Sequence, residues 1–346
     1  MATIQDVARS AGVSTATVSR VLSAPGRVAE ATRARVLAAV DSLGYSPNVA
    51  AKMLRTLRTQ KILVTVPDIS NPFFSQVIRG VEEAASAAGY SVLLGDTRHE
   101  PEREDQYAAM LRRKEADGLI FLGHRLSDTL AEMAAALGPG APIVNGCEYS
   151  PALAVSSAHI DNQQAAAEAM AHLYGLGHRR VGVVTGPLAS PLSRDRLAGV
   201  RAAAQIAGVQ AAGAVEGLAV ATGDFSVEAG AALARDMLSA ATPPTALFCF
   251  SDEMAMGALA ALRGLGLACP RDVSLVGFDD IRFAAYLDPP LTTVSQPMAE
   301  IGHETVRLLL EILSGQAAAP RNVTLPHRLV VRASTAAPVA GTSAGG

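Results

Sequence analysis

Polar and aromatic side chains follow the apolar runs of this sequence, at the positions where predicted strands end. Arg196 and Asp279 both lie at such positions. A guanidinium and a carboxylate there can hold the vicinal hydroxyls of a small ligand, while aromatic rings cover its apolar or π face. The other candidates of this kind are Asp68, Ser70, Phe73, Phe74, Ser251 and Asp252. Taken singly, Asp252 and Asp161 are interpreted as helix caps and Phe73 as a core residue.

The sequence favours a binding protein over an enzyme. No GxGxxG follows a predicted strand, and no P-loop or HExxH motif is present. Cys147, Cys249 and Cys269 are odd in number and far apart, which indicates reduced cytosolic thiols and gives no zinc-site spacing. His178, beside two arginines, is interpreted as a cation at a helix end. We therefore expect no catalytic residues, no metal and no cofactor.

Strand-like and helix-like segments alternate from residue 61 onward, which predicts an α/β fold built on parallel sheets. Two such series indicate two lobes, because one sheet holding all these strands would be large. Ligands of open α/β sheets bind beyond the carboxyl ends of the strands, so the cleft between the lobes is the expected site. The predicted strands are 62–66, 92–94, 119–122, 142–145, 181–185, 246–250 and 273–278.

Composition and charge restrict the class further. The chain has 346 residues, 49% of them hydrophobic, and a net charge of −3. No apolar run approaches the ~20 residues that a membrane span needs, and the amino terminus lacks the pattern of a secretory signal. A cytoplasmic protein is expected. Residues 1–60 carry eight basic and three acidic residues, so a basic head precedes an acidic body, as is typical of nucleic-acid-binding proteins.

The first 22 residues have the pattern of a helix-turn-helix. Thr3 is a good helix cap, and an apolar stripe at helical spacing runs from Ile4 to Ala11. Gly12 stops this helix, and Ser14 caps a second one whose buried side is Val18, Val21 and Leu22. The opposite face of the second helix displays Thr15, Ala16, Ser19 and Arg20. Arg20 is long enough to reach guanine O6 and N7, and Ala16 can contact a thymine methyl.

Two further segments complete the head. A third helix is predicted over 31–43, with Val36, Leu37, Val40 and Leu43 directed inward. Ser46-Pro47 then opens a helix over 47–55 that is too short to be stable alone. On this hinge helix, Lys52 and Arg55 would face phosphate, as would the following Arg58. Leu54 has no core to enter, which suits a minor-groove wedge.

These features together resemble the LacI/GalR family of bacterial transcription regulators over nearly the whole chain. The resemblance is carried by ATIQDVARSAGVSTATVSRVL at the start, by GYSPN at 44–48 and by Leu54. It implies base reading by Thr15, Ala16 and Arg20, with Leu54 intercalating. It further implies phosphate contacts from Ser14 and from Thr17 or Ser19. The family also implies a periplasmic-binding-protein-like core whose lobes are joined by crossovers, expected near 161, 291 and 321.

Within the family, the resemblance is to cytidine repressors. It rests on PDISNPFFSQVIRGVE from residue 67, on the segment around RDRLAG and on GDFSVEAG from residue 223. It implies a nucleoside effector and places Arg196, Phe225 and Asp279 at effector-contacting positions. The alternative is a sugar or sugar phosphate. A purine corepressor is disfavoured, because Ser190 and Leu192 stand where purine binders place a second cation.

The expected organisation is a helix-turn-helix domain at 1–46, a hinge helix and linker at 47–60, a two-lobe effector and dimerisation domain at 61–335, and a disordered tail at 336–346. One short helix reads only a few base pairs, so we expect a homodimer on a pseudopalindromic double-stranded DNA operator. No membrane partner is expected. A free solute-binding protein would share the body, but it needs a signal peptide and no basic head.

Overall fold

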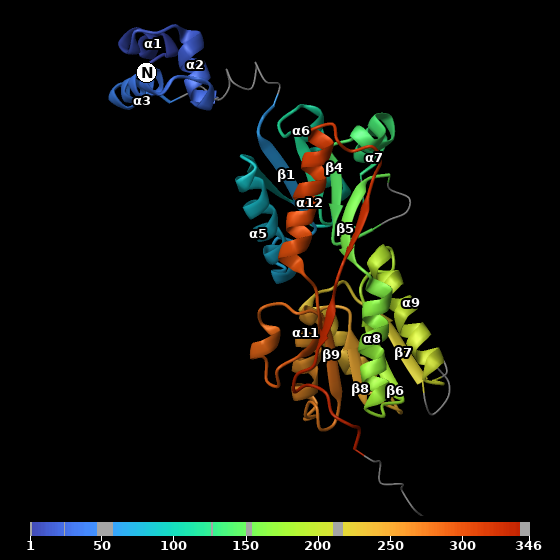
Figure 1. Cartoon of the computed structure of the whole chain (residues 1–346). Coiled ribbons are helices and arrows are strands. Elements are labelled where there is room, and N and C mark those ends of the chain that lie inside the picture. The colour runs from blue at the N-terminus through green and yellow to red at the C-terminus, as the bar shows by residue number, and fades with distance from the viewer. Residues whose placement is uncertain are drawn as a thin grey trace, which may run out of the picture. The chain divides into compact units, whose positions relative to one another are not determined.

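The computed structural model describes residues 2–23, 25–46, 58–125, 127–149, 154–209 and 217–339. The chain divides into two compact units, Met1–Thr59 and Gln60–Gly346, called here the head and the body (Figure 1). Lys52, Leu54 and Arg55 of the predicted hinge helix lie outside the described residues.

The described part of the head contains short helices in the predicted order. These are α1 (Ile4–Ala11), α2 (Thr15–Ser23), the 3₁₀ turn η1 (Pro25–Arg27) and α3 (Glu30–Leu43). Thr3 and Asp6 form a capping box on α1, in which the Asp6 N–H donates to the Thr3 hydroxyl at 3.3 Å and the Asp6 carboxylate accepts from the Thr3 N–H at 3.0 Å. Gly12 ends α1 with a φ of 63°, a left-handed conformation that glycine adopts without steric cost.

The core of the head differs in part from the prediction. Val7, Val18, Val21 and Val36 are buried, as the apolar stripes indicate. Leu37 and Leu43 were expected inside but are 42% and 39% exposed, while Ala39 is buried. The helical period explains Leu37, because consecutive residues point about 100° apart around a helix and Leu37 follows the buried Val36.

The first lobe of the body is a parallel sheet covered on both faces. Its strand order is β11-β5-β4-β3-β1-β2. The strands are β1 (Lys61–Val66), β2 (Ser91–Asp96), β3 (Gly118–Phe121), β4 (Ile143–Gly146), β5 (Ser156–Ile160) and β11 (Asn322–Leu325). One buried cluster joins the sheet to α5 (Pro72–Ala87) and α12 (Met298–Leu313), and another joins it to α6 (Pro101–Arg112) and α7 (Asp128–Leu137). The turn η2 (Gly138–Gly140) follows α7.

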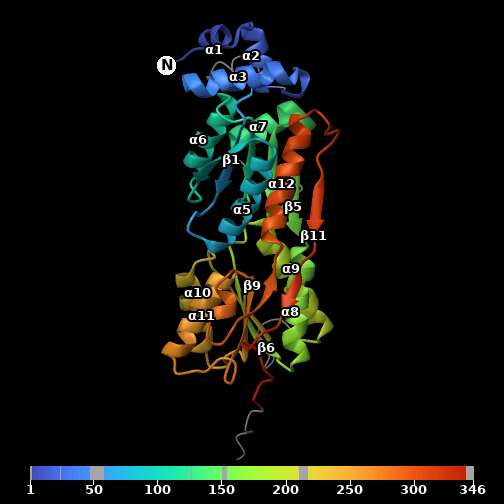
Figure 2. The same ribbon diagram turned by 60° about the vertical axis from the view of Figure 1, so that its left-hand side comes forward.

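The second lobe repeats this plan. Its order is β12-β10-β9-β8-β6-β7, parallel except that β12 runs antiparallel to β10. The strands are β6 (Arg180–Thr185), β7 (Gly217–Thr222), β8 (Ala246–Cys249), β9 (Ser274–Asp279), β10 (Thr292–Ser295) and β12 (Arg328–Val330). Helices α8 (Asn162–Gly175) and α9 (Pro191–Ile206) lie on one side, and α10 (Val227–Leu238) and α11 (Asp252–Gly264) on the other (Figure 2). The turn η3 (Ala284–Tyr286) follows β9.

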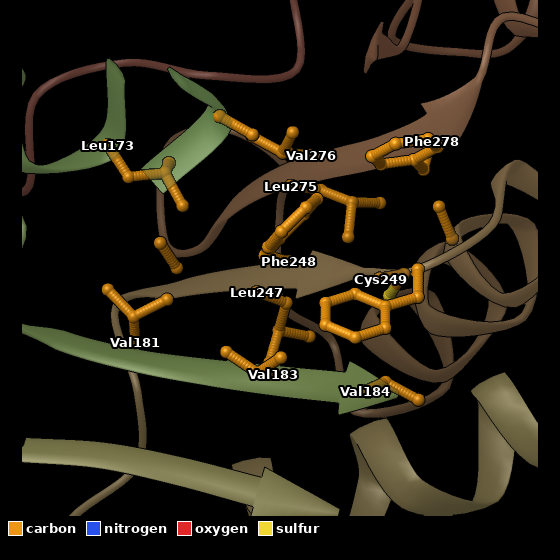
Figure 3. Packing of buried hydrophobic residues seen from close by; sticks show 14 of the residues in the cluster. Leu173, Val181, Val183, Val184, Leu247, Phe248, Cys249, Leu275, Val276 and Phe278 are labelled. Carbon is orange, nitrogen blue, oxygen red and sulfur yellow. The ribbon is translucent and has the colours of Figure 1, made fainter. Parts of the chain in front are cut away.

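The central strands of this lobe are buried on both faces. Phe248 of β8 and Phe278 of β9 are fully buried, with ring centroids 6.5 Å apart, and Val183 of β6 lies in the same cluster (Figure 3). Such continuous apolar runs are what parallel sheets require, because helices cover both sides. The strands predicted from the sequence are the segments that contain such apolar runs. The strands missing from the prediction are β5, β7, β10, β11 and β12, which are polar or lie toward sheet edges.

The chain crosses between the lobes three times within the described residues. The first crossing is at Asp161, between β5 and α8, where it was expected. The second runs from β10 to α12 through Gln296-Pro297, and the third from β11 to β12 through Pro326-His327. Both lie later than the expected positions near 291 and 321, because β10 and β11 precede the crossings.

The expected disordered tail does not begin at Ala336. The Ala336 carbonyl accepts hydrogen bonds from His178 Nε2 at 2.9 Å and from the Ser274 hydroxyl at 3.0 Å. These bonds fasten the segment after β12 to the second lobe. Residues 340–346 of the predicted tail lie outside the described residues. None of the described helices is long and apolar enough to cross a bilayer.

Candidate DNA-recognition surface and ligand cleft

The predicted base-reading residues share one exposed face of α2. Thr15, Ala16 and Arg20 are exposed, whereas Val18 and Val21 on the other face are buried in the head core. Because the apolar residues of α2 repeat at helical spacing on the buried face, the outer face carries the short side chains of Thr15 and Ala16 and the long cationic side chain of Arg20. This arrangement lets a helix approach base edges in a major groove.

The predicted phosphate contacts lie at the start of the same helix. The Ser14 hydroxyl accepts a hydrogen bond from the Thr17 backbone N–H at 3.1 Å, and the two hydroxyls are 2.9 Å apart. Ser14 thus caps α2, as expected. Ser14 is exposed, while Thr17 and Ser19 are partly buried. A helix amino terminus with hydroxyl groups is well suited to phosphate oxygens.

The body contains a large cleft to which both lobes contribute. Its cavity has a volume of about 920 Å³, within the range of small-molecule sites. All six predicted effector residues line it: Phe73, Phe74, Arg196, Phe225, Ser251 and Asp279. The structure therefore brings together side chains that are up to 206 positions apart in the sequence. Asp68 and Ser70 line the same cavity.

Phe73 and Phe74 lie on the first turn of α5. Asn71 caps this helix by accepting a hydrogen bond from the Phe73 N–H at 2.9 Å, and Pro72 occupies its first position. The two rings meet edge to face with centroids 5.2 Å apart. Phe73 also belongs to the buried core of the lobe, so the core interpretation and the cleft position both hold.

Arg196 projects from α9 into a buried environment. Its Nε donates to Asn162 Oδ1 at 2.8 Å, and its Nη1 donates to the Phe250 carbonyl at 2.6 Å. The guanidinium carbon lies 3.5 Å from the centroid of the Phe278 ring. Burial lowers the pKa of Arg196 to about 10 against the raising effect of Asp279 and other charged groups, so it stays charged at neutral pH. Several N–H groups remain beyond these two bonds.

Asp279 ends β9 in the second lobe. It is 8% exposed, and its Oδ1 accepts a hydrogen bond from Gln296 Nε2 at 2.7 Å. Burial raises its pKa to about 7, although Arg196 and Gln296 favour the charged form. Gln296 belongs to the second crossing between the lobes. A carboxylate held in this way is an oriented acceptor for a hydroxyl.

Five non-glycine residues that line the cavity have a positive φ. These angles are 51° at Arg98, 57° at His99, 70° at Cys147, 72° at Phe225 and 116° at Asp279. Such conformations cost roughly 1–3 kcal/mol each and cluster at functional sites. Phe225 is further constrained by Gly186, where a Cβ atom would lie 2.0 Å from the Phe225 ring. The backbone around the cleft therefore holds its side chains in defined positions.

Two interpretations from the sequence were wrong. Ser251, not Asp252, caps α11, accepting from the Met254 N–H at 3.1 Å. Asp252 is fully buried and accepts from the Ile281 N–H at 2.8 Å and the Thr293 hydroxyl at 2.6 Å. His178 is not the helix-end cation that was predicted, because it is 1% exposed and burial lowers its pKa. Asp161 does cap α8, accepting from the Gln164 N–H at 2.9 Å.

Sequence reasoning missed several polar residues of the cleft. Glu148, Glu253 and Gln296 line the cavity together with His124 and Arg125. Glu148 follows β4 and could have been found by its place after a strand. Glu253 lies on the first turn of α11, where a carboxylate has the simpler role of favouring the helix dipole. The described residues contain no cluster of acidic, His and Cys side chains suited to a metal ion.

The comparisons with known proteins match both units. Residues 3–48 match bacterial regulatory proteins of the lacI family, and residues 170–335 match a periplasmic binding protein-like domain. The transcriptional repressor CytR of Escherichia coli (strain K12) is 42% identical over 337 residues, which are 97% of each chain. The chain belongs to the lacI family. The resemblance seen in the sequence is thereby confirmed, and so is the α/β fold with its amino-terminal helix-turn-helix.

Two further relatives are also transcriptional repressors. The repressor PurR of Photobacterium profundum is 35% identical over 335 residues, covering 96% of this chain and 98% of that one. The lac repressor dimer bound to operator and the anti-inducer ONPF has a TM-score of 0.85 at 30% identity, over 97% of this chain and 99% of that one. The chain is accordingly a DNA-binding transcriptional regulator and not an enzyme.

Proposed function

We propose that this protein is a cytoplasmic repressor whose affinity for operator DNA is controlled by a nucleoside bound in the cleft. The observation that carries the nucleoside assignment is the meeting of Arg196, Asp279 and phenylalanines in one cavity. Ribose hydroxyls require both donors and an acceptor, and leaving a buried charged group unpaired is costly. The arginine and the aspartate meet these needs.

The aromatic side chains favour a ligand with a base. Phe73 and Phe74 come from the first lobe and Phe225 from the second, and all three line the same cavity. A flat heterocycle can stack on such rings or meet their edges. A free sugar would leave part of this apolar surface without a partner.

The DNA-binding half of the proposal rests on the head. The exposed face of α2, with Thr15, Ala16 and Arg20, would read base edges, while Ser14 and Thr17 or Ser19 contact phosphates. Two copies of the chain would bind the two halves of a pseudopalindromic operator. Lys52 and Arg55 would bind phosphates, and Leu54 would wedge into the minor groove.

The link between the two halves is a population shift. A ligand bound between the lobes favours one lobe arrangement by its differential affinity. In a dimer, a change in lobe arrangement alters the separation of the two hinge segments. A short hinge helix is only marginally stable, so a small change decides whether it forms and inserts Leu54.

A sugar effector is the alternative, because two similar structures are named for sugar ligands. A transcriptional regulator CelR–cellobiose complex is 32% identical with a TM-score of 0.73, and a LacI family regulator from Enterococcus faecium with bound ribose is 28% identical with a TM-score of 0.70. The sugar phosphate form has less support. The cationic side chains Arg98 and Arg125 at the cleft are already paired with Asp96 and Glu104.

Calorimetry of the full-length protein with cytidine, uridine, adenosine and free ribose tests the effector class. We expect a nucleoside to bind at least tenfold more tightly than ribose, and 2′-deoxycytidine more weakly than cytidine. Arg196→Lys and Asp279→Asn should each weaken nucleoside binding by roughly tenfold, because a hydroxyl partner is lost. Binding of ribose or a sugar phosphate without any nucleoside would contradict the effector assignment and leave the regulator function standing.

A further inference from the structure

Glu148 is a buried carboxyl group that lines the ligand cleft. It lies in the loop after β4, on the first lobe, and is 6% exposed. The contacts assigned above to a ribose and to stacking do not use it. A buried acidic side chain needs a partner, because burying an unpaired charge is costly.

The partners of Glu148 come from the opposite lobe. The Ser190 hydroxyl donates to its Oε1 at 3.0 Å and lies 3.3 Å from its Oε2. Ser190 is the cap residue of α9, yet its side chain makes no capping bond to the helix. Its hydroxyl is turned toward Glu148 instead. The backbone of Leu192, on the first turn of α9, also hydrogen-bonds to the carboxylate. Glu148 thus caps a helix of the other lobe.

These bonds leave acceptor capacity on a carboxylate that lines the cavity. An ionised carboxylate has about four lone-pair sites, and Ser190 and Leu192 occupy only some of them. The charged groups of α9 that act on Glu148 are Arg196 and Arg194. Arg196 interacts electrostatically with both Glu148 and Asp279. A ligand whose hydroxyls engage Arg196 and Asp279 therefore has Glu148 within the same cavity.

Near neutral pH, Glu148 is present in both its protonated and its ionised form. Burial raises its pKa to about 7, and the bonds from Ser190 and Leu192 together with the two arginines act in the opposite direction. The neighbouring Cys147 thiol stays protonated, because burial raises its pKa well above the usual value. At slightly alkaline pH Glu148 is a carboxylate that only accepts hydrogen bonds, and at acidic pH it also donates one.

We propose that Glu148 determines the base specificity of the cleft by accepting a hydrogen bond from the amino group of a 4-aminopyrimidine nucleoside. This inference rests on the proposed nucleoside effector and adds to it the choice of base. A 4-oxopyrimidine presents an acceptor oxygen where the amino group presents a donor. The ionised Glu148 then faces another acceptor, and neither oxygen has a hydrogen to share. The amino group of the ligand and the Ser190 hydroxyl would then both donate hydrogen bonds to the Glu148 carboxylate. Recognition of the base and contact between the lobes therefore depend on the same side chain.

The sign of the pH effect follows from these pairings. Cytidine binds the ionised form of Glu148 and needs no proton. Uridine requires the protonated form, whose O–H donates to its 4-oxo group. Uridine affinity should therefore fall as pH rises through about 7, and the preference for cytidine should increase. Asp279 also titrates near neutrality, but it faces the sugar that both ligands share, so its effect cancels in their ratio.

The test is calorimetry of full-length protein with cytidine and uridine at pH 6.0 and pH 8.5. We expect the ratio of their affinities to grow at least tenfold toward the higher pH. Glu148→Gln should remove most of the preference and its pH dependence, because an amide both donates and accepts. Glu253→Gln is the matched control, since Glu253 lines the same cavity and burial raises its pKa to about 7. This control should behave like the wild type. Thermal melting confirms that each variant is folded.

Each outcome separates the two proposals. An affinity ratio that is equal at both pH values in the wild type, or unchanged in Glu148→Gln, overturns the role of Glu148 while the nucleoside effector stands. Loss of the preference in Glu253→Gln instead assigns base reading to the other carboxyl group and also overturns it. Failure of the wild type to bind any nucleoside overturns the nucleoside effector, and this inference with it.

Discussion

Arg20 is the residue of the head on which the proposed base reading most depends. It is exposed on the outer face of α2, opposite the buried Val18 and Val21. A guanidinium can donate two hydrogen bonds to O6 and N7 of one guanine, which a short side chain cannot replace.

Arg20→Ala should cost ~1–3 kcal/mol of operator binding, confined to one base position in each half-site. Fluorescence anisotropy would measure this on an operator selected by the wild-type protein and on its single-base variants. Arg27→Ala, an exposed arginine outside α2, is the matched control and should leave the base preference unchanged. A uniform loss of affinity over all DNA sequences in Arg20→Ala would mean that Arg20 contacts phosphate.

At the scale of residues, sequence reasoning found several side chains of the cleft that stand after strands. Arg196 and Asp279 were located by that rule and by family resemblance, and both line the cleft. Glu148 was missed because its importance comes from Ser190, 42 positions away on the other lobe. His178 was interpreted as a helix-end cation and Asp252 as a helix cap, because burial is a tertiary property. Their types and neighbours in the sequence give no sign of it.

The hinge segment is the part of the chain whose sequence makes the most specific prediction about DNA binding. It contains Lys52, Arg55 and a leucine, Leu54, without a predicted core. A leucine inserted between base pairs unstacks them and bends the duplex, which enlarges the surface that the protein can contact.

Leu54→Ala should leave the fold and effector binding intact, reduce DNA bending and weaken specific binding by roughly tenfold. A circular-permutation gel assay measures the bend, and calorimetry with the effector reports on the body. Leu37→Ala provides a control, because Leu37 is also a leucine of the head and is 42% exposed. If the Leu54 variant bends DNA as the wild type does, Leu54 is not the wedge.

Strands that are mostly apolar were predicted well, and several strands that are polar or lie at sheet edges were missed. The buried strands β1, β3, β6, β8 and β9 are mostly apolar, so their sequences identify them. The strand β5 contains two buried serines, Ser156 and Ser157, whose hydroxyls bond to the backbone of Arg321 and to Asn322. Such a strand looks polar until its partners are known. The strands β7, β11 and β12 lie at sheet edges, where only one side of the strand pairs with another strand. Their sequences therefore carry a weaker strand signal.

The whole body is fastened by contacts that join distant segments. His178, before β6, bonds to the Thr245 and Ser274 hydroxyls and to the Ala336 carbonyl. These partners come from the connections and strands of the second lobe and from the segment after β12. Burial lowers the pKa of His178, so the folded lobe holds it neutral. In the unfolded chain His178 is protonated with a pKa near 6.5, whereas in the folded lobe it binds the proton only at lower pH.

Stability should therefore decrease as pH falls below about 6.5, by at most ~1.4 kcal/mol per pH unit for this one group. Melting curves at pH 7.5 and 5.5 measure the change. In His178→Gln the decrease should be smaller than in the wild type, whatever its absolute stability. His303→Gln, at an exposed position on α12, should retain the wild-type decrease. Equal decreases in all three proteins would show that His178 does not control acid stability.

The sequence by itself determined the family, the two-part organisation and the order of most elements. These follow from local signals: a capped apolar stripe, a glycine turn, alternating apolar runs and a basic segment before an acidic one. Each signal lies within about twenty residues, so chain neighbours are enough to express it.

The tertiary structure alone decided where the last two crossings between the lobes lie, which carboxyl groups are buried and which residue bridges the cleft. Glu148 meets Ser190, and His178 meets Ala336 across 158 positions. Such pairs are set by strand order and lobe packing, which depend on all the elements at once. Burial then sets their charge states, because desolvation disfavours the ionised form regardless of neighbours in the chain. These contacts and charge states can therefore be assigned only from the folded structure.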